Sequence, residues 1–371
     1  ALAAPPPWVQ AEVELHRQEL LQAGWGPRSL SRGRLEALAE SLVTIPPFRQ
    51  GEGPVGMRLC RFQVQDGHIS SCDVTLTATG HDDALLNALT VLAEFTKLPD
   101  LDFFVSTTDV EHTAWELPVF TKQRPAGPEG DTLLLIPHEF LLTTWNRKLE
   151  LIARRAALHW PWEEKYGRLF WRGGSTAQWI CGRPDGTNCT AIDFGGGLSL
   201  SSLALCPRGR LVLLSSLASA EVDAKFSGVF DPELSDAALR WGWAESGKSE
   251  VRSRTSYETY FAYRYGWNDE HSDAVFWRLR GNSLQFITVG SYTHWLLPHR
   301  ATLRPFVHFL PVKHDQSDLL EQIRWAREHD NQAQQMAEAA ANVTLEMLDP
   351  EAGPLVYLHS LLLMYAELQA F

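Results

Sequence analysis

Two glycines and two hydroxyl residues follow a short apolar run in the stretch GRLFWRGGSTAQWICGR, residues 167–183. Glycine lets the backbone approach a ligand closely, and hydroxyls with free N–H groups suit an anion. The spacing matches neither a Walker loop nor a GxGxxG fingerprint, so a phosphate-binding turn and an ordinary strand-to-helix turn both stay open. We expect a strand that ends at Trp171 and a turn made by Arg172, Gly173, Gly174, Ser175 and Thr176.

A carboxylate follows another expected strand, in PDLDFFVSTTDVEH, residues 99–112. The apolar run Leu101–Val105 leads to Ser106 and onward to Asp109, at the carboxyl end of a strand, where α/β folds place catalytic groups. Asp109 is therefore a candidate general base toward an alcohol, and the nearby Glu111 and His112 are lesser candidates. The alternative is a helix N-cap or a solvated loop acid.

A third candidate is YRYGWNDEHSDAVFWRLRGNSLQF, residues 263–286. Its turn-rich part, Gly266 to Ser272, precedes an expected helix from Asp273 to Leu279, whose first N–H groups suit an anionic ligand. We expect Arg278 and Arg280 to form surface ion pairs, because helical spacing does not direct both toward one ligand. The candidate ligand-binding residues here are Arg264, Trp267, Asn268, Ser272 and Asp273.

The sequence lacks the residue spacings that are typical of metal sites, redox pairs and serine hydrolases. The thirteen histidines form no HxxxH or HExxH pattern, and the five cysteines form no CxxC, so we expect no metal site and no cofactor. One or two disulfides are compatible with these cysteines. There is no GxSxG nucleophile elbow, and we expect no acidic pair that holds a nucleotide-bound cation.

Composition narrows the class of partner. The net charge of −12 argues against binding to nucleic acid or to an anionic membrane, and no run of about 20 apolar residues is present to span a bilayer. The fourteen tryptophans suit core packing, and aromatic clefts also suit sugars. A chain of 371 residues with 44% apolar residues is long enough for two cores.

The elements that must position these residues alternate between strands and helices. Helical spacing covers Val9–Val43, and Asp66–Gly67 marks the turn of a hairpin. The alternation predicts α/β domains with doubly wound parallel sheets. We expect strands at 101–105, 133–137, 168–171, 210–214, 284–289 and 307–309, and helices at 84–95, 149–159, 273–279, 319–329 and 353–371; residues 256–263 fit neither pattern clearly.

Three segments together resemble one known family. They are LPDLDFFVSTTD, then AALHWPWEEKYGRLFWRGGSTA, then GNSLQFITVGSYTHWLLPHRATLRPFVHFLPVKHDQSDLLEQIRWAREHD. The order is similar to that of the CAP10-like glycosyltransferases of family 90, which include protein O-glucosyltransferases acting on EGF repeats and fungal capsule xylosyltransferases. The resemblance runs from about Leu98 to Val343.

This resemblance implies a GT-B enzyme with two Rossmann-like domains. It implies metal-independent, inverting transfer of glucose or xylose from a UDP-sugar to a hydroxyl of a glycan or glycoprotein. The family's base lies in a motif like NVRDYP, matched here by STTDVEH, so the role passes to Asp109. The diphosphate segment RGS/T matches residues 172–176, and a later phosphate-binding arginine best matches Arg183.

One position departs from the family pattern. Many relatives carry a phosphate-clamping arginine in a motif such as SFRF, and counting back from Asn282 places it at Ala274. Arg264, Arg278 or the helix start at Ser272 could take its place. The remaining alternatives are a catalytically silent relative that binds a glycan or client protein and, more distantly, a glycoside hydrolase.

The resemblance and the break at WPWEEKYG predict two domains. Residues 1–162 form an acceptor and base domain with a helical cap, residues 163–346 bind the nucleotide-sugar, and the helix at 347–371 packs back on the first domain. The chain begins without methionine, in ALAAPPPWVQ, and carries the sequons Asn188-Cys189-Thr190 and Asn342-Val343-Thr344. We therefore expect an upstream signal or anchor and a place in the lumen of the endoplasmic reticulum or Golgi.

Overall fold

The computed structural model of this chain describes residues 4–43, 59–71, 81–106, 115–142, 144–174, 207–228, 238–244, 257–269, 274–290, 292–295, 302–349 and 353–370. The chain forms two compact units. Unit 1 comprises Ala1–Lys148, Ser291–Leu303 and Val343–Phe371, and unit 2 comprises Leu149–Gly290 and Arg304–Asn342. Among the described residues, no helix has the length and apolar character that crossing a bilayer requires.

Unit 1 is built on a mixed sheet with the strand order β2-β1-β3-β4-β6. Strand β1 pairs antiparallel with β2 and β3, whereas β3, β4 and β6 are parallel. Asp66 and Gly67 both have positive φ, at 50° and 79°, which confirms the expected hairpin. The strands are β1 (Leu59–Gln65), β2 (His68–Ser71), β3 (Leu101–Ser106), β4 (Val119–Thr121) and β6 (Leu133–Leu135), with a separate pair β5 (Gln123–Pro125) and β11 (Tyr292–His294).

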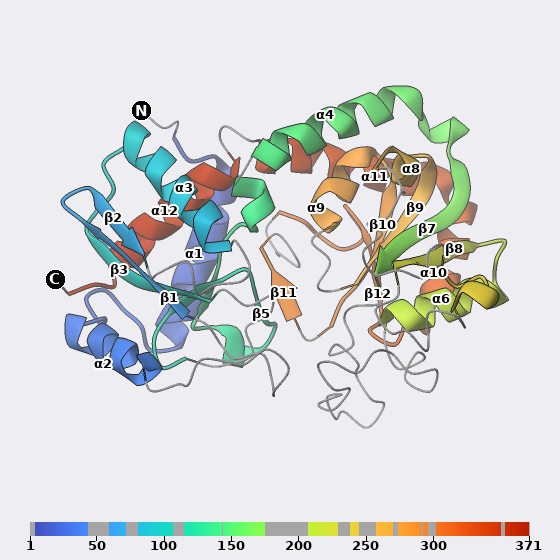
Figure 1. The fold of residues 1–371 in the computed structure, drawn as a ribbon. Coiled ribbons are helices and arrows are strands. Elements are labelled where there is room, and N and C mark those ends of the chain that lie inside the picture. The colour runs from blue at the N-terminus through green and yellow to red at the C-terminus, as the bar shows by residue number, and fades with distance from the viewer. Residues whose placement is uncertain are drawn as a thin grey trace. The chain divides into compact units, whose positions relative to one another are not determined.

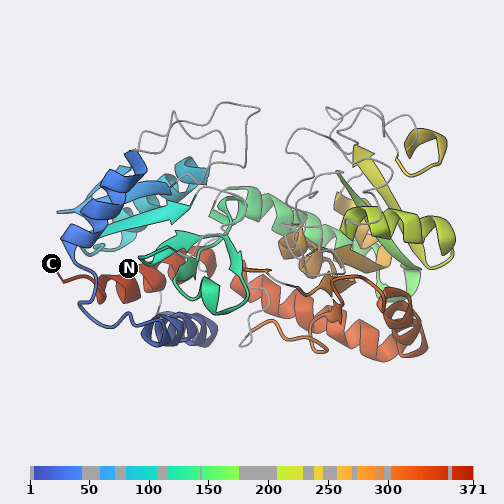
Figure 2. The same ribbon diagram turned by 90° about the horizontal axis from the view of Figure 1, so that it is seen from below.

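Helices cover this sheet through aromatic contacts. Tyr365 packs against Phe120 of β4 with ring centres 4.9 Å apart, so that α12 lies on the sheet. Trp8 of α1 stacks on Tyr357 of α12 at 6.2 Å, and α1 thus packs on α12, as Figure 2 shows. The helices of unit 1 are α1 (Pro7–Gln22), α2 (Arg32–Val43), α3 (His81–Phe95), α12 (Gly353–Ala366) and the short η2 (Pro128–Gly130) and η3 (Glu139–Leu142).

Unit 2 contains a fully parallel sheet with the order β12-β10-β9-β7-β8 (Figure 1). Strand β8 lies on one side of β7, and every later strand lies on the other side, so the winding direction reverses between β7 and β9. The inner β10 is buried at every position, as expected for a strand covered on both faces. The strands are β7 (Tyr166–Gly174), β8 (Val222–Gly228), β9 (Tyr263–Asn268), β10 (Leu284–Thr288) and β12 (Leu310–Val312).

Successive residues of β7 point to opposite faces of this sheet. Trp171 joins the large core formed with α6 (Pro207–Leu217), α10 (Leu319–Glu328) and α11 (Asp330–Met347). Phe170 instead meets Tyr260 on the other face, where α4 (Thr144–His159), α8 (Tyr257–Phe261) and α9 (Val275–Arg278) lie. Unit 2 is therefore a three-layer α/β structure, which confirms the predicted fold class, while the GT-B arrangement of two domains stays a prediction. The short helices η4 (Trp162–Glu164) and η6 (Leu279–Gly281) complete this unit.

Four local predictions were wrong. The strand expected to end at Trp171 continues to Gly174, so no turn begins at Arg172. Residues 210–214 are helical within α6, because Leu211 and Val212 bury a helix face that begins at Pro207. The strand expected at 307–309 lies at Leu310–Val312, after a tight turn in which Phe306 has a φ of 61°. The turn expected from Gly266 instead begins beyond Asn268, since Gly266–Asn268 belong to β9.

Candidate functional site

The carboxyl ends of the parallel strands form one edge of the unit 2 sheet. In open α/β sheets, ligands bind at this edge where the strand order reverses. Gly174 ends β7 and Asp269 directly follows β9, the two strands between which the reversal occurs. Arg172, Gly173 and Gly174, which were expected to form a turn, belong to β7, and its last residue Gly174 lies at the point of the sheet that favours a ligand.

Arg208, in the first turn of α6, brings a guanidinium to the same point. Its Nε lies 2.6 Å from Oδ2 of Asp269, and its Nη1 donates to the carbonyl of Gly174 at 3.3 Å. The Asp269 side chain is 1% exposed and that of Arg208 is 17% exposed. Oδ1 of Asp269 is buried and has no hydrogen-bond partner in the described part of the chain. This ion pair thus places a partly exposed guanidinium, its charge balanced by Asp269, at the carboxyl ends of the strands.

Sequence reasoning missed both members of this pair. The stretch containing Arg208 was interpreted as the approach to a strand at 210–214, which hid the helix start. Pro207 was the available signal, because proline favours the first position of a helix. The pairing with Asp269, 61 residues further on, had no local signal.

Arg172 and Gly173 have structural contacts within the sheet. The Arg172 side chain is 6% exposed, forms a 2.9 Å ion pair with Asp223 and stacks over the Phe170 ring at 4.4 Å. A Cβ at Gly173 would lie 2.4 Å from the indole of Trp171, so glycine is needed there for packing. Gly174 is the member of the expected turn that the structure places beside Arg208.

Trp267 and Asn268 lie at the end of β9 but are completely buried. Asn268 Nδ2 donates to Gln285 at 2.9 Å, and its Oδ1 accepts from Arg278 Nη1 at 2.9 Å. Arg278 also donates to the Trp267 carbonyl at 2.8 Å and lies over the Tyr260 ring at 4.5 Å. These contacts fix the carboxyl end of β9 within the protein interior.

The expectation that Arg278 and Arg280 form surface ion pairs was wrong. They are only 4% and 3% exposed, because the short α9 and η6 turn inward against the sheet. Burial lowers the pKa of the Arg278 guanidinium. Ala274 directly precedes α9 in this segment.

Arg264 lies away from these residues, at the amino end of β9. Its Nη1 is 2.9 Å from Asp330 Oδ1, its Nε donates to the Trp162 carbonyl, and it lies over the Trp162 ring at 5.5 Å. At the same edge, Lys165 Nζ donates to the carbonyls of Phe261 and Gly281 at 2.5 and 3.2 Å. The structure does not bring Arg264 together with Gly174 and Asp269.

Six candidates lie outside the described residues: Asp109, Ser175, Thr176, Arg183, Ser272 and Asp273. Asp109 follows β3, whose last residue is Ser106, and Ser175 follows β7. Within the described ranges, no group of three or more His, Cys, Asp and Glu side chains is arranged to hold a metal ion. These calls therefore stay predictions.

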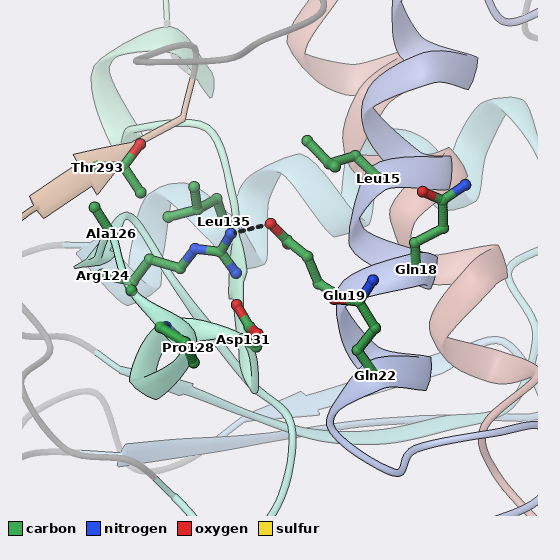
Figure 3. Close-up of a pocket in the computed structure, with 11 residues that line it drawn as sticks. Leu15, Gln18, Glu19, Gln22, Arg124, Ala126, Pro128, Asp131, Leu135 and Thr293 are labelled. Carbon is green, nitrogen blue, oxygen red and sulfur yellow. Dashed lines mark hydrogen bonds and ion pairs between the residues drawn. The ribbon is translucent and has the colours of Figure 1, made fainter.

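A pocket of about 350 Å³ in unit 1 contains a second buried ion pair (Figure 3). Arg124 Nη2 lies 2.7 Å from Glu19 of α1, and Arg124 Nη1 donates to the carbonyls of Gly130 and Leu133. His16 donates to the other oxygen of Glu19 at 3.1 Å. Burial alone raises the pKa of Glu19. The hydrogen bond from His16 and the charge of Arg124 outweigh this effect and lower the pKa to about 2. This pair joins α1 to the β5–β6 connection.

Comparison with known proteins shows which family the carboxyl-terminal part of the chain resembles. Residues 204–371, which include Arg208, Asp269 and the sheet from β8 to β12, match the model of Glycosyl transferase family 90. A protein O-glucosyltransferase 2 from Danio rerio is 27% identical over 305 residues, covering 77% of this chain and 51% of the relative. Over residues 204–371, a little under half of the chain, the protein is similar to glycosyltransferase family 90. This confirms the resemblance seen in the sequence.

Other relatives share shorter segments. A protein O-glucosyltransferase 3 from Rattus norvegicus is 29% identical over 166 residues, covering 44% of this chain and 30% of the relative. The corresponding protein from Homo sapiens is 28% identical over 150 residues, covering 38% of this chain and 28% of the relative. The chain thus spans about half the length, or less, of these curated relatives.

Proposed function

We propose that this protein is an inverting glycosyltransferase that needs no metal ion. It moves xylose or glucose from a UDP-sugar to a hydroxyl of a glycan or glycoprotein. The observation that carries the proposal is the Arg208–Asp269 pair beside Gly174, at the reversal point of a doubly wound sheet in a chain similar to family 90. A guanidinium in that place suits the diphosphate of a nucleotide-sugar.

The proposed reaction is a single displacement. Asp109 takes the proton of the acceptor hydroxyl while its oxygen forms a bond to C1 of the sugar, and the bond from C1 to UDP breaks. General-base help supplies about 10²–10⁴-fold in rate. The departing UDP carries the negative charge, which Arg208 and the start of α6 stabilise in place of a metal ion. Arg183, Ser175 and Thr176 remain proposed contacts of the same diphosphate.

Arg208 also answers the question raised by Ala274. Relatives that carry an arginine at the position of Ala274 would place that charge just before α9, whereas this chain holds Arg208 beside β9 through Asp269. Arg264 is a less suitable substitute because it lies at the amino end of β9, and Arg278 is less suitable because it is only 4% exposed and is bound to Trp267 and Asn268.

The proposal is tested by UDP release. Wild-type protein is incubated with UDP-xylose, UDP-glucose and other UDP-sugars, with and without EDTA, beside the Asp109→Asn variant. We expect release with at least one donor, unchanged by EDTA and reduced at least 100-fold by the substitution. Absence of release with every donor, or equal release from the variant, contradicts the catalytic proposal.

A catalytically silent protein is the second candidate, and alanine at position 274 favours it. Such a protein would bind a glycan or client protein without turning over UDP-sugars. A thermal-shift experiment with UDP separates the two, because a ligand that binds only the folded state raises its apparent stability. No shift with UDP or any UDP-sugar, together with no UDP release, favours the silent protein.

We further propose that the protein works in the lumen of the secretory pathway. Cys60 of β1 is disulfide-bonded, and disulfides persist in oxidising compartments. Asn342, the acceptor residue of one sequon, is exposed on α11. Mass spectrometry of the protein from secretory cells tests this: a reduced Cys60 and an unmodified Asn342 contradict it.

A further inference from the structure

Helix α4 exposes two of its three leucines to solvent. Leu151 is 57% exposed and Leu158 is 84% exposed. The opposite side of the helix buries the smaller Ala153 and Ala156, which pack with Phe261 of α8. A surface helix places its larger apolar side chains toward the core when nothing else acts on them. Figure 1 shows α4 lying outside α8 and α9, and this outward face has no role in the functions discussed so far.

The two exposed leucines form one apolar ridge. Because an α-helix turns by about 100° per residue, side chains seven positions apart lie within about 20° of one another around its axis. This leucine ridge, made by Leu151 and Leu158, is about 10 Å long at about 1.5 Å per residue. Single exposed leucines are ordinary on protein surfaces, whereas two aligned ones offer a partner one continuous apolar contact.

Cations flank the leucine ridge on both sides, each about 40–60° from Leu151 around the helix axis. All four are exposed, and they are Arg147 and Arg154 on one side and Lys148 and Arg155 on the other. Glu150 is the single acid of the helix, and it is ion-paired with Arg154 at 2.6 Å. The next acids along the chain, Glu163 and Glu164, belong to η4. The exposed face of α4 is therefore positive, although the chain as a whole carries a net charge of −12.

A second helix is a poor match for this face. Helices that pack along a seven-residue repeat need apolar side chains at its first and fourth positions. With the leucine ridge at one of these positions, Arg154 or Arg155 takes the other, so no apolar seam forms. A lipid surface needs no seam, because leucine side chains enter the boundary between headgroups and acyl chains while flexible Arg and Lys stems keep the charges among the headgroups.

We infer that this face of α4 docks the protein reversibly on an anionic lipid membrane. Each Arg or Lys near such a surface strengthens binding by about fivefold, and the leucines add an apolar contribution. The net charge of −12 argues against membrane binding by the surface as a whole, so the inference is confined to the face where the charge is reversed. Two leucines and four cations provide a weak attachment, well below that of a membrane-spanning helix.

Vesicle flotation tests the inference directly. Wild-type protein is mixed with vesicles of phosphatidylcholine alone, or of phosphatidylcholine with about 30% phosphatidylserine, and the bound fraction is measured after centrifugation. We expect binding to the anionic vesicles to be at least about 10-fold stronger than to the neutral ones, and to fall when salt is raised to about 500 mM. No UDP-sugar is present, so the outcome does not depend on the proposed function.

Two variants separate the leucines from the cations. Leu151→Gln/Leu158→Gln keeps every charge and should bind anionic vesicles about 10–100-fold less tightly. Arg154→Gln/Arg155→Gln keeps both leucines and should bind about 10–30-fold less tightly. All four side chains are exposed, so both variants should keep the fold, which circular dichroism checks.

Matched controls change the same residue types elsewhere in unit 2. Leu217→Gln/Leu239→Gln removes two leucines that are 86% and 43% exposed, and Arg240→Gln/Arg324→Gln removes two exposed arginines. Both controls should bind like wild type. Lack of binding to either vesicle, equal binding to both, or equal binding by wild type and the leucine variant overturns the inference. Binding to an immobilised acidic leucine-zipper peptide without binding to vesicles also overturns it and assigns the face to a protein partner.

Discussion

Replacement of Arg208 should show how strongly the sheet edge depends on one ion pair. Arg208→Met removes the partner of Asp269, whose side chain is 1% exposed, and leaves a buried carboxylate without its cation. Breaking such a pair costs about 3–5 kcal/mol, because the remaining charge has lost its solvation and its partner. In a unit of this size that corresponds to a fall in Tm of roughly 6–20 °C.

The double variant Arg208→Met/Asp269→Asn is the control that isolates the charge. Asparagine keeps the shape of Asp269 but carries no charge, so the double variant should recover most of the lost Tm, measured by circular dichroism at pH 7. Both variants should lose affinity for UDP by about 10–100-fold in calorimetry, since a hydrogen bond to a charged group contributes about 1.5–3 kcal/mol. A single variant as stable as wild type, or no recovery in the double variant, would refute the reasoning.

Three further predictions concern stability. Glu19 has a pKa of about 2 in the folded state, against an ordinary value of 4.5. Its ionised form therefore contributes about 3 kcal/mol to the free energy of unfolding above pH 4.5, and this contribution is lost as the pH falls toward 2. Urea titrations should show this loss in wild type and not in Glu19→Gln. Burial lowers the pKa of Lys165 from 10.5 to about 7, so between these pH values the unfolded chain binds one more proton than the folded chain. The free energy of unfolding, relative to that of Lys165→Met, should therefore rise by about 2–3 kcal/mol from pH 7 to pH 9. A difference that stays flat or falls over this range contradicts the prediction. Gly173→Ala should lower the free energy of unfolding by about 1–3 kcal/mol, because the added Cβ would lie 2.4 Å from the Trp171 ring. Gly167→Ala should lower it less, because no atom lies within 4 Å of the added Cβ. Equal Tm values for the two variants would contradict the packing argument.

Much of the fold was predictable because the signals were local. The hairpin at Asp66–Gly67 and the strands Leu101–Ser106 and Leu284–Thr288 follow from turn residues and continuous apolar runs. The apolar run at 210–214 failed for the same reason, since a short run of this kind fits a buried helix and a buried strand equally well. Its burial against the sheet, with Pro207 at the start, decided for the helix.

Sequence reasoning looked for the candidate site at the ends of strands but did not identify the charged groups that lie there. The end of the strand before Ser175 was expected to meet the ligand, and β7 ends at Gly174, whereas β9 was not predicted as a strand. Arg172, Arg264 and Arg278 were chosen because they are cations near those motifs, yet the structure pairs each with other groups of unit 2. Arg208 had no such motif beside it.

By itself, the sequence indicated strands such as Leu101–Ser106 and Leu284–Thr288, several helices and the resemblance to family 90, because hydrophobic spacing and motif order are properties of neighbouring residues. Only the tertiary structure decided that β9 lies beside β7 and that Arg208 therefore meets Asp269 at their shared edge. Strand order determines which distant residues become neighbours, and burial then makes their pairing energetically necessary.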